Sequence, residues 1–384
     1  MEEMSAEGWR EKFRARRVVE MARHMSVGDG LGAALEWLDP METEFRELEL
    51  AEMGRAASIS GRPTSEEALG STLRVMTWNI KFGGGRVDFW FDGHGDRAVL
   101  NGQEVLEAME GVAAAIEALD PDILLLQEVD RRSRRVDGMD QFQWLLDHTP
   151  MNYGAYASQW RCRWVPTRGL GAVDMGVAIL SKTPIVDARR IALPQIEDEA
   201  RITRYFYLKR GMLSARVQSG DRRGVRVVNI HTEPFARDRT KWRQLRAFRW
   251  EMERLRQSGE PWIAGGDLNA IPPGSEKVHR FEDQARTPPG FEGSDFRGEE
   301  DWLAPFYERY EPAVSLAAYR RDNGPYLTHS STGDVFWCRK LDYLWTDRRF
   351  GWDEVQTHQG ELARGLRAME LSDHAPVSAM WSWE

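Results

Sequence analysis

Short apolar segments, separated by helical stretches, recur from residue 73 to the end of the chain. Some alternate apolar and polar residues and others are apolar throughout, as expected for strands buried on one face and on both faces. Helices are expected at 103–118, 140–148 and 237–256. Strands interleaved with helices predict an α/β fold of stacked layers. The expected strands are LRVMTWNI (73–80), DILLLQEV (122–129), MGVAILS (175–181), MLSARVQ (212–218), VRVVNIHT (225–232), PWIAGGDLN (261–269), KLDYLWT (340–346) and APVSAMW (375–381).

The beginning of the chain differs from the rest, and two domains are expected: a helical N-terminal extension with a linker (1–70) and a catalytic domain (71–384). Apolar residues recur with helical spacing between residues 9 and 25 and again over 31–53, and SISGRPTSEEALGS (58–71) is typical of a linker. The basic face of the first helix either contacts nucleic acid or lipid or is simply solvated.

The composition is that of a soluble globular protein, with 41% hydrophobic and 29% charged residues. A net charge of −9 argues against a surface that coats nucleic acid broadly. Cys162 and Cys338 have neither zinc-binding spacing nor the pattern of a disulfide framework. No run reaches the roughly 18 apolar residues of a membrane helix, and the N-terminus is charged. We therefore expect no integral membrane segment and a cytoplasmic location; the sequence indicates no oligomeric state.

Polar residues stand at the ends of six of the expected strands. Each has an ordinary structural explanation: a turn residue, a surface ion pair or a buried histidine with a satisfied ring. Asp342 is the hardest to explain in this way, because an unpaired carboxylate inside an apolar strand costs several kcal/mol. Strand ends are where ligands of α/β proteins gather. The residues concerned are Asn79, Glu128, His231, Asp267, Asn269, Asp342, Asp373 and His374.

The chemistry available to these side chains is narrow. Carboxylates and an amide, without thiolates, are the ligands preferred by a hard cation such as Mg²⁺ or Mn²⁺. Phosphoryl transfer requires charge neutralisation, an oriented water and a group that manages the charge of the leaving oxygen. Asp, Asn and His side chains can supply all three.

In chain order, the segments MTWNI, LLLQEVD, VVNIHT, AGGDLNA, LDYLWTD and LSDHAPV resemble the signature of the endonuclease/exonuclease/phosphatase superfamily. The resemblance covers residues 73–384 and is nearest to bacterial members whose glutamate motif, LQEVD, precedes a basic loop. It implies a four-layer α/β sandwich, in which two mixed, mainly antiparallel β-sheets pack face to face with helices outside. The N-terminal extension lies outside it.

The resemblance also implies roles for individual residues. Glu128 resembles the principal metal ligand, with Asn79 and Asp373 nearby. Asp267 corresponds to the residue that orients or deprotonates the attacking water, and Asn269 to a hydrogen-bond donor to the phosphoryl oxygens.

The two histidines also have counterparts in the superfamily. Asp342 resembles the partner of His374, fixing its tautomer and raising its basicity. His231 resembles the second histidine of the deoxyribonuclease and sphingomyelinase branches. IHTEP follows one strand where many relatives read THL, and Met175 stands where abasic-site enzymes have an aromatic residue; both differences argue against abasic-site repair.

Arginine clusters at 131–135, 161–168 and 237–243 flank strands that carry the expected site. They form either a rim that attracts a polyanion or ordinary solvated surface. The candidates for substrate contacts are Arg134, Arg135, Arg163 and Arg239. The tryptophans among these charges either stack on bases or pack in the core.

The sequence thus predicts a divalent-metal-dependent phosphodiester hydrolase acting on a phosphate-containing substrate, most simply a nuclease acting on nucleic acid. The alternatives are a phosphatase or phospholipase C-type hydrolase acting on a phosphorylated small molecule or lipid headgroup, and an inactive binding module that retains the fold.

Overall fold

The computed structural model describes residues 58–61, 72–89, 95–197, 204, 206–218, 224–235, 238–283, 295–331 and 336–382. The helices expected near the N-terminus and most of the expected linker lie outside the described residues. No helix in the described part of the chain is long and apolar enough to cross a membrane.

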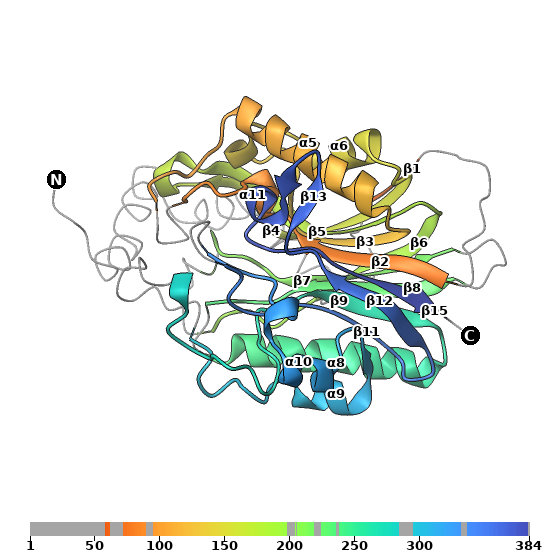
Figure 1. Cartoon of the computed structure of the whole chain (residues 1–384). Helices are drawn as coiled ribbons and strands as arrows, with labels where there is room; N and C mark the ends of the chain where they lie inside the picture. The colour runs from red at the N-terminus through yellow and green to blue at the C-terminus, as the bar shows by residue number, and fades with distance from the viewer. Residues whose placement is uncertain are drawn as a thin grey trace, which may run out of the picture.

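Two β-sheets lie face to face in the middle of the molecule, and helices cover their outer faces (Figure 1). In the first sheet the strand order is β1-β4-β5-β3-β2-β15-β12, and in the second it is β10-β11-β9-β8-β7-β6. Within each sheet one pair is parallel, β2 with β3 and β8 with β9, and the other pairs are antiparallel. The predicted four-layer sandwich of two mixed, mainly antiparallel sheets is confirmed.

The element bounds follow the expected segments closely. The first sheet comprises β1 (Ser58–Gly61), β2 (Thr72–Asn79), β3 (Ile123–Asp130), β4 (Tyr153–Val165), β5 (Gly171–Ser181), β12 (Gly351–Thr357) and β15 (Val377–Ser382). The second comprises β6 (Ile185–Ala192), β7 (Gly211–Val217), β8 (Val225–His231), β9 (Trp262–Asp267), β10 (Glu311–Pro312) and β11 (Asp342–Thr346). A separate hairpin consists of β13 (Glu361–Ala363) and β14 (Leu366–Arg367). The α-helices are α5 (Gly102–Leu119), α6 (Gln141–His148), α8 (Thr240–Ser258), α9 (Ala304–Arg309), α10 (Leu316–Arg321) and α11 (Ala368–Leu371).

Strand β3 shows why a continuous apolar run forms a central strand. Successive side chains of a strand point to opposite faces. Leu124 and Leu126 therefore pack in the core shared with α5, while Ile123 and Leu125 pack in the core between the two sheets. A further core lies between the second sheet and α8, where Phe248 is fully buried. Both faces of each central strand are thus covered by apolar side chains.

The linker prediction is wrong for Ser58–Gly61. These residues form β1, which pairs antiparallel with β4 at the edge of the first sheet. A strand at a sheet edge gains backbone hydrogen bonds even when its sequence has little apolar character.

Candidate active site

The topology brings the polar strand ends together at one edge of the sandwich. Because β2 and β3 are parallel, Asn79 and Gln127 are register partners, and Glu128 comes next in β3. Because β8 and β9 are parallel, His231 lies beside Asp267. Strands β11 and β15 run antiparallel to these neighbours, so their first residues, rather than their last, lie at the same edge.

A glycine lets β9 reach this position. Gly266 has φ +130°, and a Cβ at this residue would lie 2.0 Å from the carbonyl oxygen of Ile230 on β8. Only glycine tolerates that approach and that backbone conformation. Gly266 therefore allows β9 to pair closely with β8 immediately before Asp267, and Gly265 allows the same on the other side, where a Cβ would lie 2.3 Å from the carbonyl oxygen of Tyr343 on β11.

A buried polar bridge joins the two sheets beneath the site. The side-chain amide of Gln127 on β3 donates to Oδ1 of Asn229 on β8 at 2.7 Å and to Oγ1 of Thr77 at 3.1 Å. Asn229 in turn donates to the backbone oxygens of Leu126 and Ala178, both at 2.8 Å. Buried polar groups need such partners, and these fix the relative position of the sheets where the site residues emerge. Sequence reasoning did not identify this bridge, because its residues lie inside apolar segments.

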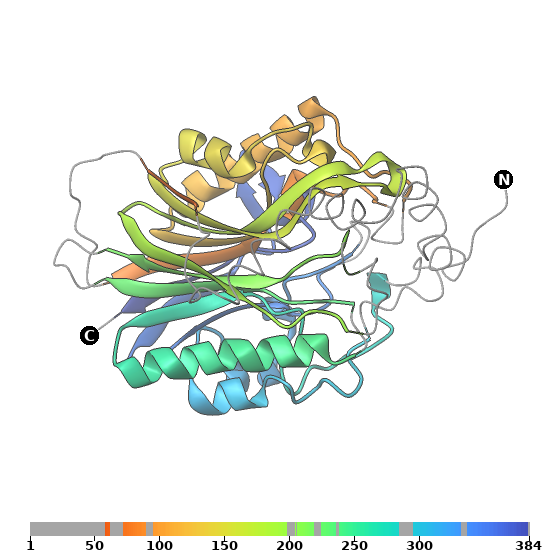
Figure 2. The same ribbon diagram turned by 180° about the vertical axis from the view of Figure 1, so that it is seen from behind.

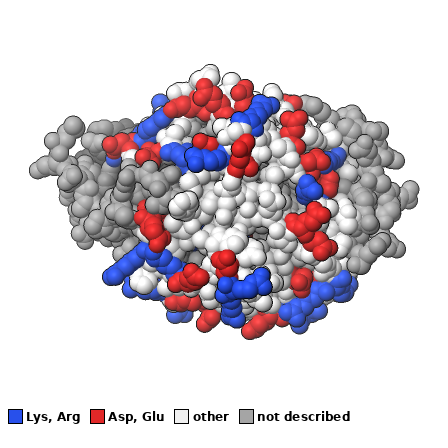
Figure 3. Space-filling view, in the orientation of Figure 1, with Lys and Arg blue, Asp and Glu red and all other residues white. Residues whose placement is uncertain are grey.

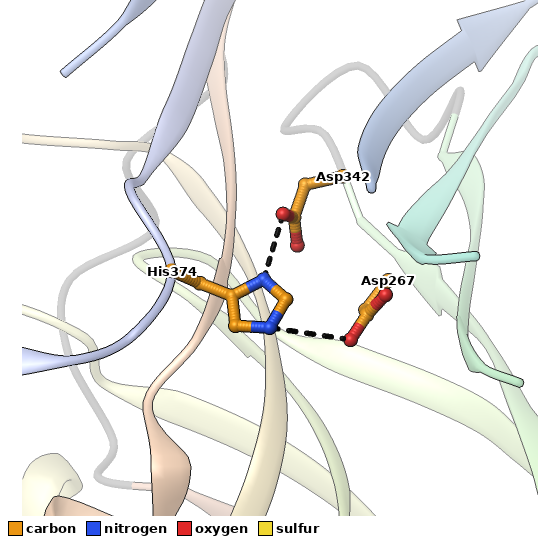
Figure 4. A group of neighbouring side chains, drawn as sticks. All are labelled: Asp267, Asp342 and His374. Carbon is orange, nitrogen blue, oxygen red and sulfur yellow. Dashed lines mark hydrogen bonds and ion pairs between the residues drawn. The ribbon is translucent and has the colours of Figure 1, made fainter. Parts of the chain in front are cut away.

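His374 stands between two carboxylates (Figure 4). Its Nδ1 is 2.8 Å from Oδ2 of Asp342, and its Nε2 is 3.6 Å from Oδ2 of Asp267. Asp342 begins β11, opposite Asp267 in the register of the second sheet. The backbone of His374 is fixed as well, because its carbonyl accepts from the indole N–H of Trp78 and its N–H donates to Oγ of Ser372. The imidazole is thus held in one orientation from both sides.

The surroundings of these groups determine their charges. Burial disfavours the imidazolium form of His374, but the negative charges of Asp342 and Asp267 outweigh burial and raise its pKa to about 10. Burial also raises the pKa of Asp267, to about 7, despite the opposing effect of the His374 cation. Near neutral pH the site therefore holds a protonated imidazole beside a carboxyl group able to exchange a proton.

Asn79, Glu128 and Asp373 lie beside this group, where the site opens. Nδ2 of Asn79 donates to Oε1 of Glu128 and to Oδ2 of Asp267, both at 3.1 Å. The side chains of Glu128 and Asp373 are 24% and 15% exposed, whereas that of Asp267 is 1% exposed. Solvent therefore reaches the site at Glu128 and Asp373.

Glu128 occupies an unusual backbone position. It has φ +54°, and the register between β3 and β5 shifts at this point, as in a β-bulge. A bulge redirects a side chain out of the sheet's regular alternation. Burial, together with the charge of Asp373, raises the pKa of the Glu128 carboxyl. The two carboxylates thus repel each other, and a cation between them would relieve that repulsion.

His231 and Asn269 complete the group. Nε2 of His231 is 3.4 Å from Oδ2 of Asp267 and 3.9 Å from Oε1 of Glu128, and its Nδ1 has no hydrogen-bond partner among the described residues. Burial lowers the pKa of His231 well below its ordinary value. Asn269 donates from Nδ2 to the carbonyl of Thr232 at 3.0 Å, and its backbone N–H donates to Oδ1 of Asp267 at 2.9 Å. The structure therefore brings all eight polar strand-end residues to one place.

Two sets of donors here have the composition of a metal site. Oxygen and nitrogen atoms of Asp267, Asp342 and His374 lie within 4.8 Å of one another, so this buried group is close enough to hold an ion. The second set consists of Asn79, Glu128 and Asp373, which all offer oxygen atoms; Glu128 and Asp373 are partly exposed, and Asn79 is buried beside them. Oxygen donors suit Mg²⁺.

The four arginines expected to bind substrate have different surroundings. Arg163 on β4 and Arg239 at the start of α8 are exposed. Arg134 is exposed, and its guanidinium donates to the carbonyl of Gly169. The face seen in Figure 3 carries basic and acidic side chains interspersed, without a continuous basic area among its described residues.

Arg135 does not lie on the exposed rim where it was expected. Its side chain is only 4% exposed and makes two hydrogen bonds to Asp130, at 2.7 and 2.9 Å. Its guanidinium also lies 3.7 Å from the centre of the Phe82 ring. A buried guanidinium that binds a carboxylate and also packs on an aromatic ring cannot belong to an exposed rim. The prediction failed because sequence spacing does not show that the η3 turn (Arg134–Val136) folds back on β3.

Three further residues contact the site without having been predicted. Lys81 places Nζ 3.4 Å from Oδ2 of Asp373, and Arg86 is close enough to lower the pKa of Asp373 electrostatically. The ring of His329 packs edge-on against that of His374, with centroids 4.5 Å apart. Proximity of Lys81 to Asn79 in the sequence was an available signal; His329 lies in a loop with no distinguishing pattern.

Residues 76–374 match the endonuclease/exonuclease/phosphatase family over most of the chain. The chain belongs to this family. The resemblance read from the motifs is thereby confirmed, and family members are hydrolases that act on phosphoester bonds. A search of curated proteins gave no match.

Solved structures support the family's fold. An endonuclease/exonuclease/phosphatase protein from Beutenbergia cavernae DSM 12333 is 20% identical, with a TM-score of 0.53 over 81% of this chain and 71% of that one. A mannosyl-6-phosphatase from Bacteroides thetaiotaomicron VPI-5482 is 14% identical, with a TM-score of 0.50 over 80% of this chain and 99% of that one. A humanized TDP2 from D. rerio is 12% identical, with a TM-score of 0.50 over 82% of this chain and all of that one. Identities this low establish the fold and no particular substrate.

Proposed function

We propose that the protein is a divalent-metal-dependent phosphodiester hydrolase, specifically a nuclease. The contact that carries the proposal is the one between Nδ1 of His374 and Asp342 at 2.8 Å, with Asp267 on the other side of the same imidazole. A carboxylate bound to one ring nitrogen fixes the tautomer and leaves the other nitrogen directed at the reaction centre.

The roles follow from charge and position. Asp267, with a pKa of about 7, accepts a proton from the attacking water. The water oxygen bonds to phosphorus, and the ester P–O bond breaks with its electron pair leaving on the alcohol oxygen, which takes up a proton from solvent water. The His374 imidazolium stabilises the negative charge on the phosphoryl group. Asn269, whose backbone N–H is bonded to Asp267, would donate a hydrogen bond to the phosphoryl oxygens.

We assign the divalent cation, Mg²⁺ or Mn²⁺, to Asn79, Glu128 and Asp373. The alternative set containing His374 is less suitable, because both ring nitrogens of His374 already face carboxylates, Nδ1 at 2.8 Å from Asp342 and Nε2 at 3.6 Å from Asp267. The repulsion between Glu128 and Asp373 is the feature that a cation fits. When bound, the cation would polarise a phosphoryl oxygen as a Lewis acid.

The hairpin β4–β5 supports a nucleic acid as the substrate. Met175 of β5 pairs with Asp130, two residues beyond Glu128, and from there the hairpin extends past β3 (Figure 2). Arg163 and Trp164 are exposed on this extension. Arginine and an aromatic ring are the usual contacts to a strand's phosphates and bases. The hairpin would therefore bind nucleotides that lie beyond the scissile phosphate on the Glu128 side of the site.

A phosphatase acting on a small phosphorylated molecule is the second candidate. It is favoured by the internal pairing of the rim arginines: Arg135 with Asp130, Arg131 with Asp140, and Arg134 with the Gly169 carbonyl. Fewer free cations would then surround the site than a long polyanion requires. The mannosyl-6-phosphatase with the same fold provides an example of this substrate class.

A substrate panel with Mg²⁺ tests the proposal: single-stranded DNA, duplex DNA, RNA, sphingomyelin and inositol phosphates. We expect cleavage of a nucleic acid. The double variant Arg163→Ala/Arg239→Ala should weaken oligonucleotide binding and flatten its salt dependence by about one log–log unit per lost contact. Cleavage of bis-nitrophenyl phosphate should stay unchanged, because this small diester does not reach the hairpin.

Arg349→Ala provides the matched control. Arg349 follows the end of β11 that is opposite Asp342, and its side chain is 52% exposed. This variant loses the same charge but should retain the wild-type salt dependence. If the enzyme cleaves an inositol phosphate or sphingomyelin but no nucleic acid, the nuclease assignment is refuted and a phosphatase or phospholipase activity is favoured.

A further inference from the structure

The outer face of helix α8 carries basic and aromatic side chains in a line. Residues spaced three or four positions apart share one side of a helix, and this side is opposite the one that α8 buries against the second sheet. Trp250 is 62% exposed, although a tryptophan is usually well buried. The guanidinium of Arg246 lies 4.6 Å from the centre of the Trp242 ring. We call this set the α8 stripe: Arg239, Trp242, Arg246, Arg249 and Trp250.

The cations of the stripe are available to bind an anion. Arg239, Arg246 and Arg249 are exposed, and none of them forms an ion pair with a carboxylate in the part of the chain that the structure describes. The acid that precedes them, Asp238, binds Arg243 instead. In a chain with a net charge of −9, three unneutralised arginines on one face form a local basic surface.

The acidic side chains of α8 do not neutralise the stripe. Glu251 is buried and binds Arg254. Glu253 lies on the same side of the helix as the stripe, but one turn beyond most of it, and it binds Arg256 and Arg309. The basic surface therefore runs from the beginning of α8 to about its middle.

The stripe begins beside the active site. Helix α8 follows β8, which ends at His231, and runs away from the site along the outer face of the second sheet (Figure 2). In its first turn Nζ of Lys241 donates to the carbonyl of Asn269 at 2.8 Å. The 11 residue steps from Arg239 to Trp250 span about 17 Å at 1.5 Å per residue. A stacked strand of about five nucleotides has the same length.

We propose that the α8 stripe binds the part of a nucleic-acid strand that extends beyond the scissile phosphate on the His231 side of the site. The inference rests on the proposed nuclease function, and it adds a binding surface on the second sheet, whereas the β4–β5 hairpin belongs to the first. The arginines contact phosphates, and Trp250 stacks on a base.

The chemistry of the stripe favours a strand over a lipid surface. A helix that lies on a membrane buries a continuous apolar face in it. The apolar face of α8 is already packed against the second sheet, where Leu245, Phe248 and Met252 are buried. The outer face offers separate aromatic rings between cations, which matches the alternation of bases and phosphates.

The test is the binding of a fluorescent oligothymidylate of about 15 nucleotides to the full-length protein, followed by anisotropy over a range of salt concentrations without divalent metal. Arg246→Ala/Arg249→Ala should weaken binding and flatten the log–log salt dependence by about 1.4, because each phosphate contact with a single strand contributes about 0.7. Trp250→Ala should weaken binding about fivefold or more, and Trp250→Phe should restore most of the affinity. Thermal melts establish that each variant is folded.

Lys182→Gln/Arg349→Ala is the matched control. It also removes two positive charges, but Lys182 follows β5 and Arg349 follows β11, both at the end of the sandwich remote from the site. Its affinity and salt dependence should equal those of wild type, and a loss equal to that of Arg246→Ala/Arg249→Ala would overturn the inference in favour of a general charge effect.

Two further outcomes separate the inference from the proposed function. If wild type cleaves nucleic acid while folded variants of the stripe bind the oligothymidylate as wild type does, the inference is overturned and the nuclease assignment stands. If the stripe variants instead lose binding to vesicles of phosphatidylserine and phosphatidylcholine, the partner is a membrane surface. If wild type neither binds nor cleaves any nucleic acid, the nuclease assignment fails and the inference fails with it.

Discussion

Replacing Asp342 by asparagine should slow hydrolysis by about two orders of magnitude without unfolding the protein. The side chain keeps its shape but loses the charge that lies 2.8 Å from Nδ1 of His374. The rise in the pKa of His374 from 6.5 to about 10 corresponds to roughly 5 kcal/mol of preference for the imidazolium form. If Asp342 supplies about half of that preference, its loss costs about 2.5 kcal/mol, which is nearly 100-fold in rate.

The assay is kcat/KM for a nitrophenyl phosphodiester with saturating Mg²⁺, for wild type, Asp342→Asn, His374→Ala and the double variant. Residues that act as one unit give non-additive losses, so the double variant should be little slower than either single variant. His148→Ala, an exposed histidine at the end of α6, should leave the rate unchanged. If the rate losses of the two single variants multiply in the double variant, the claim that the two residues act as a pair is refuted.

The pH dependence of the hydrolysis rate provides a second test of the roles of these residues. Activity requires the ionised form of Asp267, so the rate should rise as pH rises through about 7. Activity also requires the protonated form of His374, so the rate should fall as pH rises through about 10. Loss of the Asp342 charge lowers the pKa of His374 and should move the alkaline limb to lower pH. An alkaline limb that stays in place would show that His374 is not the group responsible.

Further predictions concern the rim, the metal and the domain boundary. Arg135→Ala should destabilise folding by about 3–5 kcal/mol, because it leaves Asp130 buried without its partner; a folded variant with only an altered salt dependence would contradict this role. Glu128→Ala should abolish Mg²⁺-dependent turnover with a melting temperature within a few degrees of wild type, and a large loss of stability would assign Glu128 to the fold instead. A chain beginning at Ser58 should melt at a higher temperature than one beginning at Thr72, because only the longer chain contains β1; equal melting temperatures would show that β1 contributes nothing.

The sequence predicted the strands that are covered on both faces, since continuous apolar runs such as ILLL have no other stable environment. It missed β4, β6 and β12, whose exposed charged residues interrupt the apolar pattern. These strands are defined by backbone pairing and by long-range packing, which a local pattern does not reveal. The edge strand β1 was mistaken for a linker for the same reason.

The site was more predictable than the strands around it. A polar residue that ends a buried strand is locally anomalous, and the anomaly is visible in the sequence for residues such as Glu128 and Asp342. Contacts that form because the chain turns back on itself could not be predicted from the sequence. Arg135 returns to Asp130 through η3, and Lys81 reaches Asp373, which lies far from it in the sequence.

The most direct test of the account is the position of a Mn²⁺ ion in crystals of the full-length protein, located by anomalous scattering. The account predicts a peak coordinated by Glu128 and Asp373 beside Asn79, with His374 still bonded to Asp342. A peak coordinated by His374 and Asp342 would contradict the assignment of that pair to proton and charge handling.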